Sequence, residues 1–165
     1  MKKLILMRHA KSSWAEPMQD DFDRTLNDRG KTDAPEMGRR LVKKGIKPDL
    51  VICSAAKRTR KTASLIAEAL HYNETEIIRE HDLYEASVHD MLHVIRQLDD
   101  DKETVLLIAH NPSVTGMVGY LSNSHIENMP TSSQAYISFT VKSWKQVAQN
   151  TGELNWFDYP KNTSV

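Results

Sequence analysis

Three short apolar runs recur along the chain with no polar residue inside them, at residues 4–7, 50–53 and 105–109. Uninterrupted runs of this length are typical of strands that are buried on both faces of a largely parallel sheet. The segments between and after them space their apolar residues as amphipathic helices do, notably residues 62–70 and 88–98. This alternation predicts an α/β fold, a three-layer αβα sandwich with a mostly parallel central sheet.

The first helix has two possible starting points. Proline is tolerated only in the first turn of a helix, so Pro35 implies either a start at residues 32–34 or a start near Asn27 followed by a kink. A later helix has a clearer beginning, because Ser87 and Asp90 have the spacing of a capping box. Both signals place helices directly after loops that carry polar residues.

The C-terminal part of the chain has the pattern of an antiparallel pair. Residues 135–141 alternate with period two, as expected for a half-buried strand. Residues 153–159 can pair with them as an edge strand that Pro160 ends, since proline cannot continue the ladder. We therefore expect a β-rich end to the chain.

Composition restricts the number of domains and the classes of partner. The length of 165 residues suits a single domain over residues 1–165. Lys and Arg total 22, as do Asp and Glu, and this net charge of +0 argues against general binding to nucleic acid or to an anionic membrane. The single cysteine, Cys53, excludes an internal disulfide and favours a reducing compartment. The N-terminal apolar run is too short for a signal peptide and no stretch is long enough to span a membrane, so we expect a cytoplasmic protein.

Chemistry-bearing side chains follow each of the three apolar runs. Arg8 and His9 follow the first run, residues 54–60 the second, and His110 and Asn111 the third. Ligands of open α/β sheets bind at the carboxyl ends of the strands, so two histidines and at least two arginines should converge on one edge. Guanidinium groups match phosphate oxygens, and helix N-termini offer free N–H groups to the same anion. The pattern predicts a phosphate-bearing ligand.

Four segments in this order resemble a known family. Residues 6–12 read LMRHAKS, residues 23–30 read DRTLNDRG, residues 48–63 contain CSAAKRTRKTA, and residues 108–112 read IAHNP. Together they are similar to the Arg-His motif, the segment before the first helix, the second arginine segment and the second histidine of the histidine phosphatase superfamily, the phosphoglycerate mutase-like proteins. The similarity is strongest to the short SixA-type phosphohistidine phosphatases. It implies the histidine phosphatase fold and requires no metal or cofactor.

The resemblance also implies roles for individual residues. His9 would be the nucleophile that forms a covalent phosphohistidine, which water then hydrolyses, while Arg8, Arg58 and His110 would surround the phosphoryl oxygens. A neutral imidazole is a competent nucleophile near neutral pH. Guanidinium groups stabilise the charge of the transition state, which is the role that a metal ion has in other phosphoryl-transfer enzymes.

Two positions depart from the family pattern. Ala10 replaces the usual glycine after Arg-His, a small change that should keep the close approach of the backbone. The general acid is less well marked: Glu85 lies near the expected place, with Asp20, Asp21 and Asp23 as rivals. Phosphorylated imidazole needs less protonation than an alkoxide to leave, so a phosphohistidine phosphatase could work with a weak acid or none.

Several other residues have both a functional and a structural interpretation. Ser12 and Asn111 could bind phosphate as hydrogen-bond donors or cap local turns. Arg24 could orient the loop after Arg8 and His9 or form an ordinary ion pair with the aspartates beside it. A basic group could recruit a phosphorylated partner or simply face the solvent: Lys11, Lys57, Arg60 and Lys61.

His89 and His93 have the spacing of a zinc-hydrolase helix, with Asp90 in the place of the glutamate. On a helical wheel both histidines lie opposite the apolar face, so they should point to the solvent, and no third ligand is evident. The glycines of residues 116–119 lack the full pattern of a dinucleotide-binding loop and are better explained by packing. We therefore expect no metal site and no cofactor.

The sequence predicts a metal-independent phosphatase that acts through phospho-His9, with protein phosphohistidine as the favoured substrate. The chain has little length to spare for a lid, and an open site can admit a phosphorylated side chain of another protein. Two alternatives remain. One is a small-molecule phosphomonoesterase of the same superfamily, which an efficient acid at Glu85 would favour. The other is a catalytically silent module that binds phosphoproteins. The oligomeric state is left open.

Overall fold

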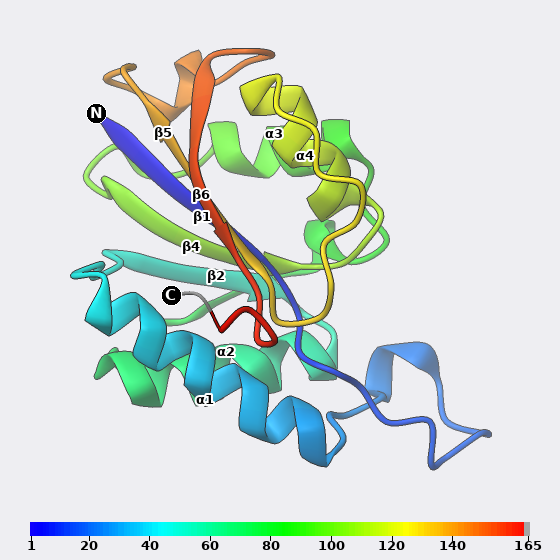
Figure 1. The fold of residues 1–165 in the computed structure, drawn as a ribbon. Helices are drawn as coiled ribbons and strands as arrows, with labels where there is room; N and C mark the ends of the chain where they lie inside the picture. The colour runs from blue at the N-terminus through cyan, green and yellow to red at the C-terminus, as the bar shows by residue number, and fades with distance from the viewer. Residues whose placement is uncertain (164–165) are drawn as a thin grey trace.

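The computed structural model describes residues 1–163 as one six-stranded mixed sheet between two layers of helices (Figure 1). The sheet has the order β3-β2-β4-β1-β5-β6; β1 to β4 are parallel, whereas β5 and β6 are antiparallel to their neighbours. The strands are β1 (Lys2–Arg8), β2 (Leu50–Ser54), β3 (Ile78–Glu80), β4 (Thr104–Ala109), β5 (Gln134–Phe139) and β6 (Gly152–Asp158). The expected three-layer α/β sandwich is confirmed.

Four α-helices form the two outer layers: α1 (Asp28–Lys43), α2 (Lys57–Leu70), α3 (Val88–Arg96) and α4 (Ser113–Ser122). Helices α1 and α2 cover one face of the sheet, and α3 and α4 cover the other (Figure 1). Residues 1–163 also contain four short 3-10 helices: Asp21–Asp23, Glu74–Glu76, His81–Leu83 and Trp144–Gln146. Among residues 1–163, no helix combines the length and the apolar character that a membrane crossing requires.

Successive residues of the central strand β1 face opposite helical layers. Ile5 and Met7 pack with Met37 of α1 in one core, whereas Leu6 packs with Met117 of α4 in the other. The side chains of residues 4–7, which lie on both faces of β1, are completely buried, and this explains why the run has no polar alternation. The central strand is therefore held rigidly where it ends at Arg8.

Helix α1 takes the earlier of its two expected starts. Asn27 is its N-cap, and the Asn27 side chain accepts a hydrogen bond of 2.9 Å from the Gly30 amide. Pro35 lies inside the helix rather than in its first turn. A Cβ built on Gly30 would lie 2.2 Å from the Lys11 carbonyl oxygen, so the missing side chain lets α1 approach the loop that follows β1.

The C-terminal strands pair as expected, with β6 beginning one residue earlier than predicted and ending before Pro160. Asp158, at the end of β6, accepts hydrogen bonds from Arg40 and Lys44 and so ties the edge of the sheet to α1. The capping box of α3, made by Ser87 and Asp90, is confirmed.

Candidate active site

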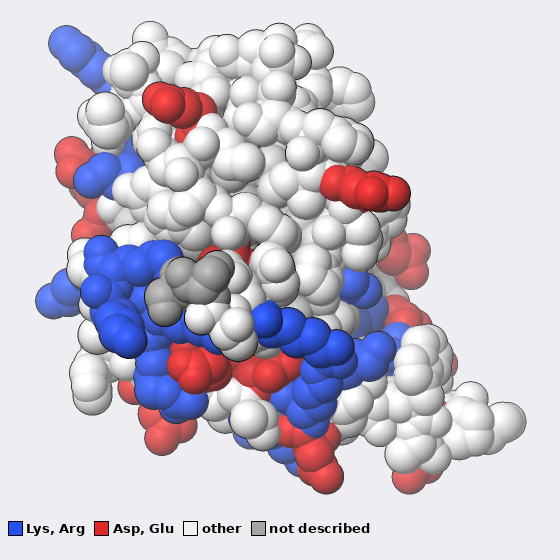
Figure 2. Space-filling view, viewed as in Figure 1, with Lys and Arg blue, Asp and Glu red and all other residues white. Residues whose placement is uncertain are grey.

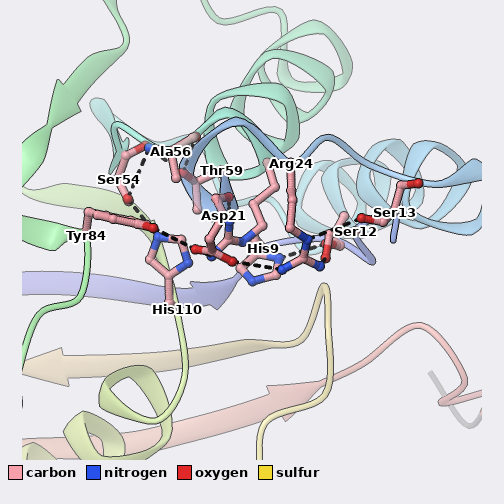
Figure 3. Close-up of polar contacts among 12 residues, drawn as sticks. His9, Ser12, Ser13, Asp21, Arg24, Ser54, Ala56, Thr59, Tyr84 and His110 are labelled. Atoms are coloured by element: carbon pink, nitrogen blue, oxygen red, sulfur yellow. Dashed lines mark hydrogen bonds and ion pairs between the residues drawn. The ribbon is translucent and has the colours of Figure 1, made fainter. Parts of the chain in front are cut away.

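The carboxyl ends of β1, β2 and β4 meet at a polar cavity of about 340 Å³. Figure 3 shows His9, Ser12, Arg24 and His110 of its lining together with polar neighbours such as Asp21, Ser54 and Tyr84. The cavity is lined by Arg8, His9, Lys11, Ser12, Trp14, Arg24, Arg58, His110, Asn111 and Thr131. All six residues that the sequence marks as a nucleophile, a second histidine or phosphate ligands are therefore brought together.

His9 lies directly beyond the end of β1 and is only 7% exposed. Its Nδ1 is 2.8 Å from the Ala10 carbonyl oxygen, and because a carbonyl only accepts, Nδ1 carries the proton and Nε2 has a free lone pair. Burial lowers the pKa of His9 to about 3; the hydrogen bond to Ala10 opposes this shift, and His110, Arg58 and Arg8 add to it. His9 is thus neutral at pH 7 and able to act as a nucleophile at Nε2.

His110 stands 5.2 Å from His9, measured between ring centroids. Its Nε2 is 2.7 Å from the Ser54 hydroxyl at the end of β2, while its buried Nδ1 has no hydrogen-bond partner among residues 1–163. Burial, followed by the charge of Arg58, lowers the pKa of His110 to about 4, so this ring is also neutral at pH 7. Its unpaired nitrogen is left over for a ligand in the cavity.

Arg8 and Arg58, two of the three arginines that line the cavity, give it an excess of positive charge. Arg8 donates to the Met129 carbonyl at 3.0 Å, but its buried Nε has no partner among the described residues. Burial and the nearby Arg58 lower the pKa of Arg8. Arg58 donates to the carbonyl oxygen of Asp21 at 2.7 Å and to its carboxylate at 3.0 Å. Since both histidines are neutral, this arrangement favours an anion that can bridge the two guanidinium groups.

Asp21 anchors the site rather than serving as its acid. Its carboxylate accepts hydrogen bonds from Arg58, from Arg24 at 3.0 Å and from the Tyr84 hydroxyl at 2.6 Å (Figure 3). Partial burial would raise the pKa of Asp21, but the hydrogen bonds from Tyr84, Arg24 and Arg58 outweigh it and leave the pKa at about 2. A carboxylate with so low a pKa is a poor proton donor at neutral pH.

Tyr84 lies beside His110 and Asp21 but does not line the cavity. Its ring packs against the His110 ring in a T-shaped arrangement, with a centroid distance of 5.6 Å. Burial and the hydrogen bond to Asp21 raise the pKa of Tyr84 to about 12, so the phenol keeps its proton. No periodic pattern marks Tyr84 or Ser54 as site residues. Their signal is only their place, since Ser54 ends the second apolar run and Tyr84 precedes Glu85.

The loop between β1 and α1 is held by a buried arginine. Arg24 donates to the Ser12 hydroxyl and, from Nε, to the Ser13 carbonyl at 3.2 Å. Both interpretations of Arg24 therefore have a geometric basis, since it holds the loop through Ser12 and Ser13 and also forms an ion pair with Asp21 at 3.0 Å. Asn111 also lines the cavity, but its Oδ1 accepts hydrogen bonds from the Thr115 amide at 3.3 Å and hydroxyl at 2.7 Å, which is the local capping role that the sequence left open, and its amide nitrogen donates to the Met129 carbonyl at 3.0 Å.

The other acid candidates lie away from the cavity lining. Glu85 is exposed and has a left-handed backbone with a φ of 55°, and it does not line the cavity. Asp20 and Asp23 are exposed as well. A general acid at Glu85 consequently stays a prediction. Of the four basic residues considered as a recruiting group, Lys11 alone lines the cavity.

Two other places were candidates for a site. His89 and His93 are exposed, as the helical wheel predicts, and residues 1–163 contain no group of three His, Cys, Asp or Glu side chains placed to hold a metal ion. A larger cavity of about 610 Å³ lies along α1, where Figure 2 shows Lys and Arg gathered with acidic residues among them. Its charges are partly paired, Arg40 and Lys44 with Asp158. No histidine or cysteine is among the residues that line it.

A family model, the histidine phosphatase superfamily (branch 1), matches residues 4–94, which is more than half of the chain. The chain belongs to the histidine phosphatase superfamily. The matched region runs from β1 into α3 and contains His9, Arg58 and Tyr84. The family resemblance that the sequence motifs indicate is thereby confirmed.

Other proteins resemble this superfamily member over nearly its full length. An uncharacterized chloroplastic protein of Arabidopsis thaliana is 28% identical, covering 94% of this chain and 74% of that protein. An uncharacterized protein of Mycobacterium leprae is 29% identical, covering 94% of this chain and 100% of that protein. The crystal structure of a putative phosphohistidine phosphatase SixA from Agrobacterium tumefaciens superposes with a TM-score of 0.82 and 25% identity, covering 96% and 98% of the two chains.

Proposed function

We propose that this member of the histidine phosphatase superfamily is a metal-independent phosphatase that hydrolyses phosphohistidine, with protein phosphohistidine favoured, through a phosphoryl group held on His9. The observation that carries the proposal is the tautomer of His9 and its place in the cavity. Its Nδ1–H donates to Ala10, so Nε2 is unprotonated and lies in a cavity that also holds Arg8 and Arg58. A fixed lone pair beside two guanidinium groups suits attack on a phosphoryl group.

The first step transfers the phosphoryl group from one imidazole to another. The Nε2 lone pair of His9 attacks phosphorus while the P–N bond of the substrate breaks, and the electrons of that bond stay on the substrate nitrogen. A substrate imidazole protonated at its other nitrogen leaves as a neutral ring, so the step needs no separate acid. His9 becomes cationic, and this charge is stabilised by the hydrogen bond to Ala10 and by the phosphoryl oxygens.

The second step is hydrolysis of phospho-His9. Water attacks phosphorus, the P–N bond breaks, and His9 recovers its neutral form because Nδ1 has kept its proton; the protons of the water remain on the phosphate. Arg8 and Arg58 stabilise the oxygens during both steps. His110 Nε2 is hydrogen-bonded to the Ser54 hydroxyl; in the tautomer in which this hydroxyl donates, the proton of His110 is on Nδ1, which has no other partner among residues 1–163 and can donate to a phosphoryl oxygen.

The surroundings of the cavity support a leaving group that is bonded to phosphorus through nitrogen. Asp21 is a poor proton donor and Glu85 does not line the cavity, which disfavours substrates whose alkoxide must be protonated as it leaves. The resemblance to the putative phosphohistidine phosphatase SixA points to the same substrate class. Protein phosphohistidine therefore fits better than an alkyl phosphate.

The test is a rapid-quench experiment with a ³²P-labelled phosphohistidine protein in excess chelator. We expect an enzyme-bound label that is stable to alkali and labile to acid, together with release of phosphate. His9→Ala should give neither, whereas the exposed His93→Ala should behave as the wild type. Release without any label would contradict the covalent route, and folded wild-type protein that neither labels nor releases phosphate would contradict the substrate.

A further inference from the structure

Trp14 is unusually exposed for a large aromatic side chain. It lies on the loop between β1 and α1, which projects from the body of the fold in Figure 1, and it is 73% exposed. Met18 on the same loop is 96% exposed, but only Trp14 lines the cavity. Exposed tryptophans are uncommon on soluble domains, and tryptophan is enriched where a protein contacts a ligand or partner.

One face of the Trp14 indole packs against the Arg24 guanidinium. The Arg24 Cζ atom lies 3.3 Å from the centroid of the Trp14 ring, a close cation–π contact. Arg24 itself is buried and fixed by hydrogen bonds to Ser12, Ser13 and Asp21. The guanidinium covers one face of the indole, while the high exposure of Trp14 shows that the rest of the ring is open. Trp14 is therefore an ordered apolar surface, not a freely moving side chain.

The position of Trp14 relative to His9 gives this surface a role. In phosphoryl transfer the nucleophile and the leaving group lie roughly in line, on opposite sides of phosphorus. Because His9 is buried, the leaving group must extend toward the mouth of the cavity. Lys11 and Trp14 are the two exposed residues among those that line it, so the leaving group passes between or beside them. Of the two, Trp14 offers a flat apolar surface.

From this arrangement we infer that Trp14 is a substrate-contacting wall that selects phosphoryl groups carried on a flat ring. The inference rests on the proposed function for the direction in which the leaving group departs. A ring such as the imidazole of phosphohistidine stacks on the open indole, and this contact is lost for a linear leaving group. Trp14 thus distinguishes phosphohistidine from phospholysine, although both substrates carry a P–N bond.

The experiment compares two substrate pairs that differ in the ring. Phosphohistidine and phospholysine peptides share the P–N bond, and phenyl phosphate and an alkyl phosphate share the P–O bond. For each substrate, kcat/KM of Trp14→Ala is divided by that of the wild type, so the intrinsic reactivity of the leaving group cancels. We expect a loss of about 5- to 10-fold for the ring-bearing member of each pair and less than about twofold for its partner.

Two further variants separate contact with the substrate from support of the loop. Trp14→Phe keeps a ring and should restore most of the preference, and Met18→Ala should leave every ratio unchanged. Equal losses for all four substrates would show that Trp14 only supports Arg24, and the absence of any loss would show that it does not touch the substrate. Either result overturns the inference.

The outcome can be separated from the fate of the proposed function. If the wild type hydrolyses phenyl phosphate but not phosphohistidine, the proposed substrate is wrong. The comparison of phenyl phosphate with an alkyl phosphate then still tests whether Trp14 contacts the leaving group. Binding supplies a readout that needs no turnover: phenylphosphonate should bind the wild type more tightly than methylphosphonate, and Trp14→Ala should abolish that difference. Equal binding of the two phosphonates to the wild type would overturn the inference.

Discussion

The two cavity histidines make the stability of the protein depend on pH. The pKa of His9 is lowered to about 3 and that of His110 to about 4, whereas an unfolded histidine has its ordinary value of 6.5. Between these values the unfolded chain binds more protons than the folded one, so the free energy of unfolding falls as pH decreases below 6.5. At pH 5 each histidine should lower this free energy by about 2 kcal/mol relative to neutral pH.

Urea unfolding at pH 7 and pH 5 measures this effect. His110→Gln removes one of the two titrating rings, so its loss of stability over this interval should be smaller than that of the wild type by about 2 kcal/mol. Between pH 8 and pH 7 the two proteins should show the same dependence, because the difference arises only when unfolded histidine takes up a proton. A variant with the full wild-type pH dependence would mean that the folded His110 binds a proton in this range.

Glu85 provides a second test at the level of a single residue. Its side chain is exposed and does not line the cavity, and a protonated imidazole needs little help to leave. Glu85→Gln should therefore change kcat/KM for a phosphohistidine peptide by less than about threefold, whereas loss of a true general acid costs about 100-fold or more. Steady-state assays of the variant on this peptide and on an alkyl phosphate decide the point, and a large loss on the peptide would restore Glu85 as the acid.

At the level of elements, the approach of α1 to the loop after β1 depends on Gly30. The Cβ of an alanine would lie 2.2 Å from the Lys11 carbonyl oxygen, so the helix or the loop must move. Gly30→Ala should lower the free energy of unfolding by about 2 kcal/mol, despite the higher helix propensity of alanine. Because Lys11 and Ser12 line the cavity, kcat/KM should also fall by about tenfold or more.

Gly119→Ala is the matched control, since Gly119 also lies inside a helix. Its added Cβ would meet only the Ser124 carbonyl oxygen at 3.5 Å, an ordinary contact. This variant should be as stable as the wild type or more stable by up to about 1 kcal/mol, with unchanged kcat/KM. Urea unfolding and steady-state kinetics of the two variants provide the comparison, and equal stabilities would contradict the steric argument.

The elements differ in how well the sequence predicts them. The buried strands β1, β2 and β4 and the cap of α3 follow from local patterns, because an uninterrupted apolar run or a capping box has few alternatives. Strand β3 has only three residues, none of them buried, and so has no apolar run to mark it. Helix α4 begins after His110 and contains two glycines, which weaken the helical pattern.

The residues of the candidate site also differ in how well the sequence predicts them. His9, Arg58 and His110 are predictable because strand ends converge at one edge of a parallel sheet. The contacts of Asp21 and the position of Trp14 are not, because both belong to a loop whose path depends on the buried Arg24. A periodic pattern contains no information about which side chains such a loop brings to the mouth of the cavity.

At the scale of the whole molecule, Asp158 links the C-terminal edge strand β6 to helix α1. Its side chain is 3% exposed and accepts hydrogen bonds from Arg40 and Lys44 of the α1 region, each at 3.2 Å. Burial alone would raise the pKa of Asp158, but the hydrogen bonds from Lys44 and the Tyr159 amide bring it below its usual range. The carboxylate is therefore ionised and holds the edge strand β6 against the helical layer.

Asp158→Asn tests whether this link stabilises the fold without taking part in the chemistry. The neutral amide leaves Arg40 and Lys44 without their counter-charge, so the free energy of unfolding should fall by about 2 to 3 kcal/mol, while kcat/KM below the unfolding temperature stays within about twofold. Glu36→Gln, which breaks the exposed pair with Arg39, should cost less than about 0.5 kcal/mol. Urea unfolding and phosphohistidine assays of both variants measure these values. A large loss of activity in folded Asp158→Asn protein would show that this edge of the sheet is coupled to the cavity, for example through Gln134, which pairs with Asp158 and with Met7 of β1.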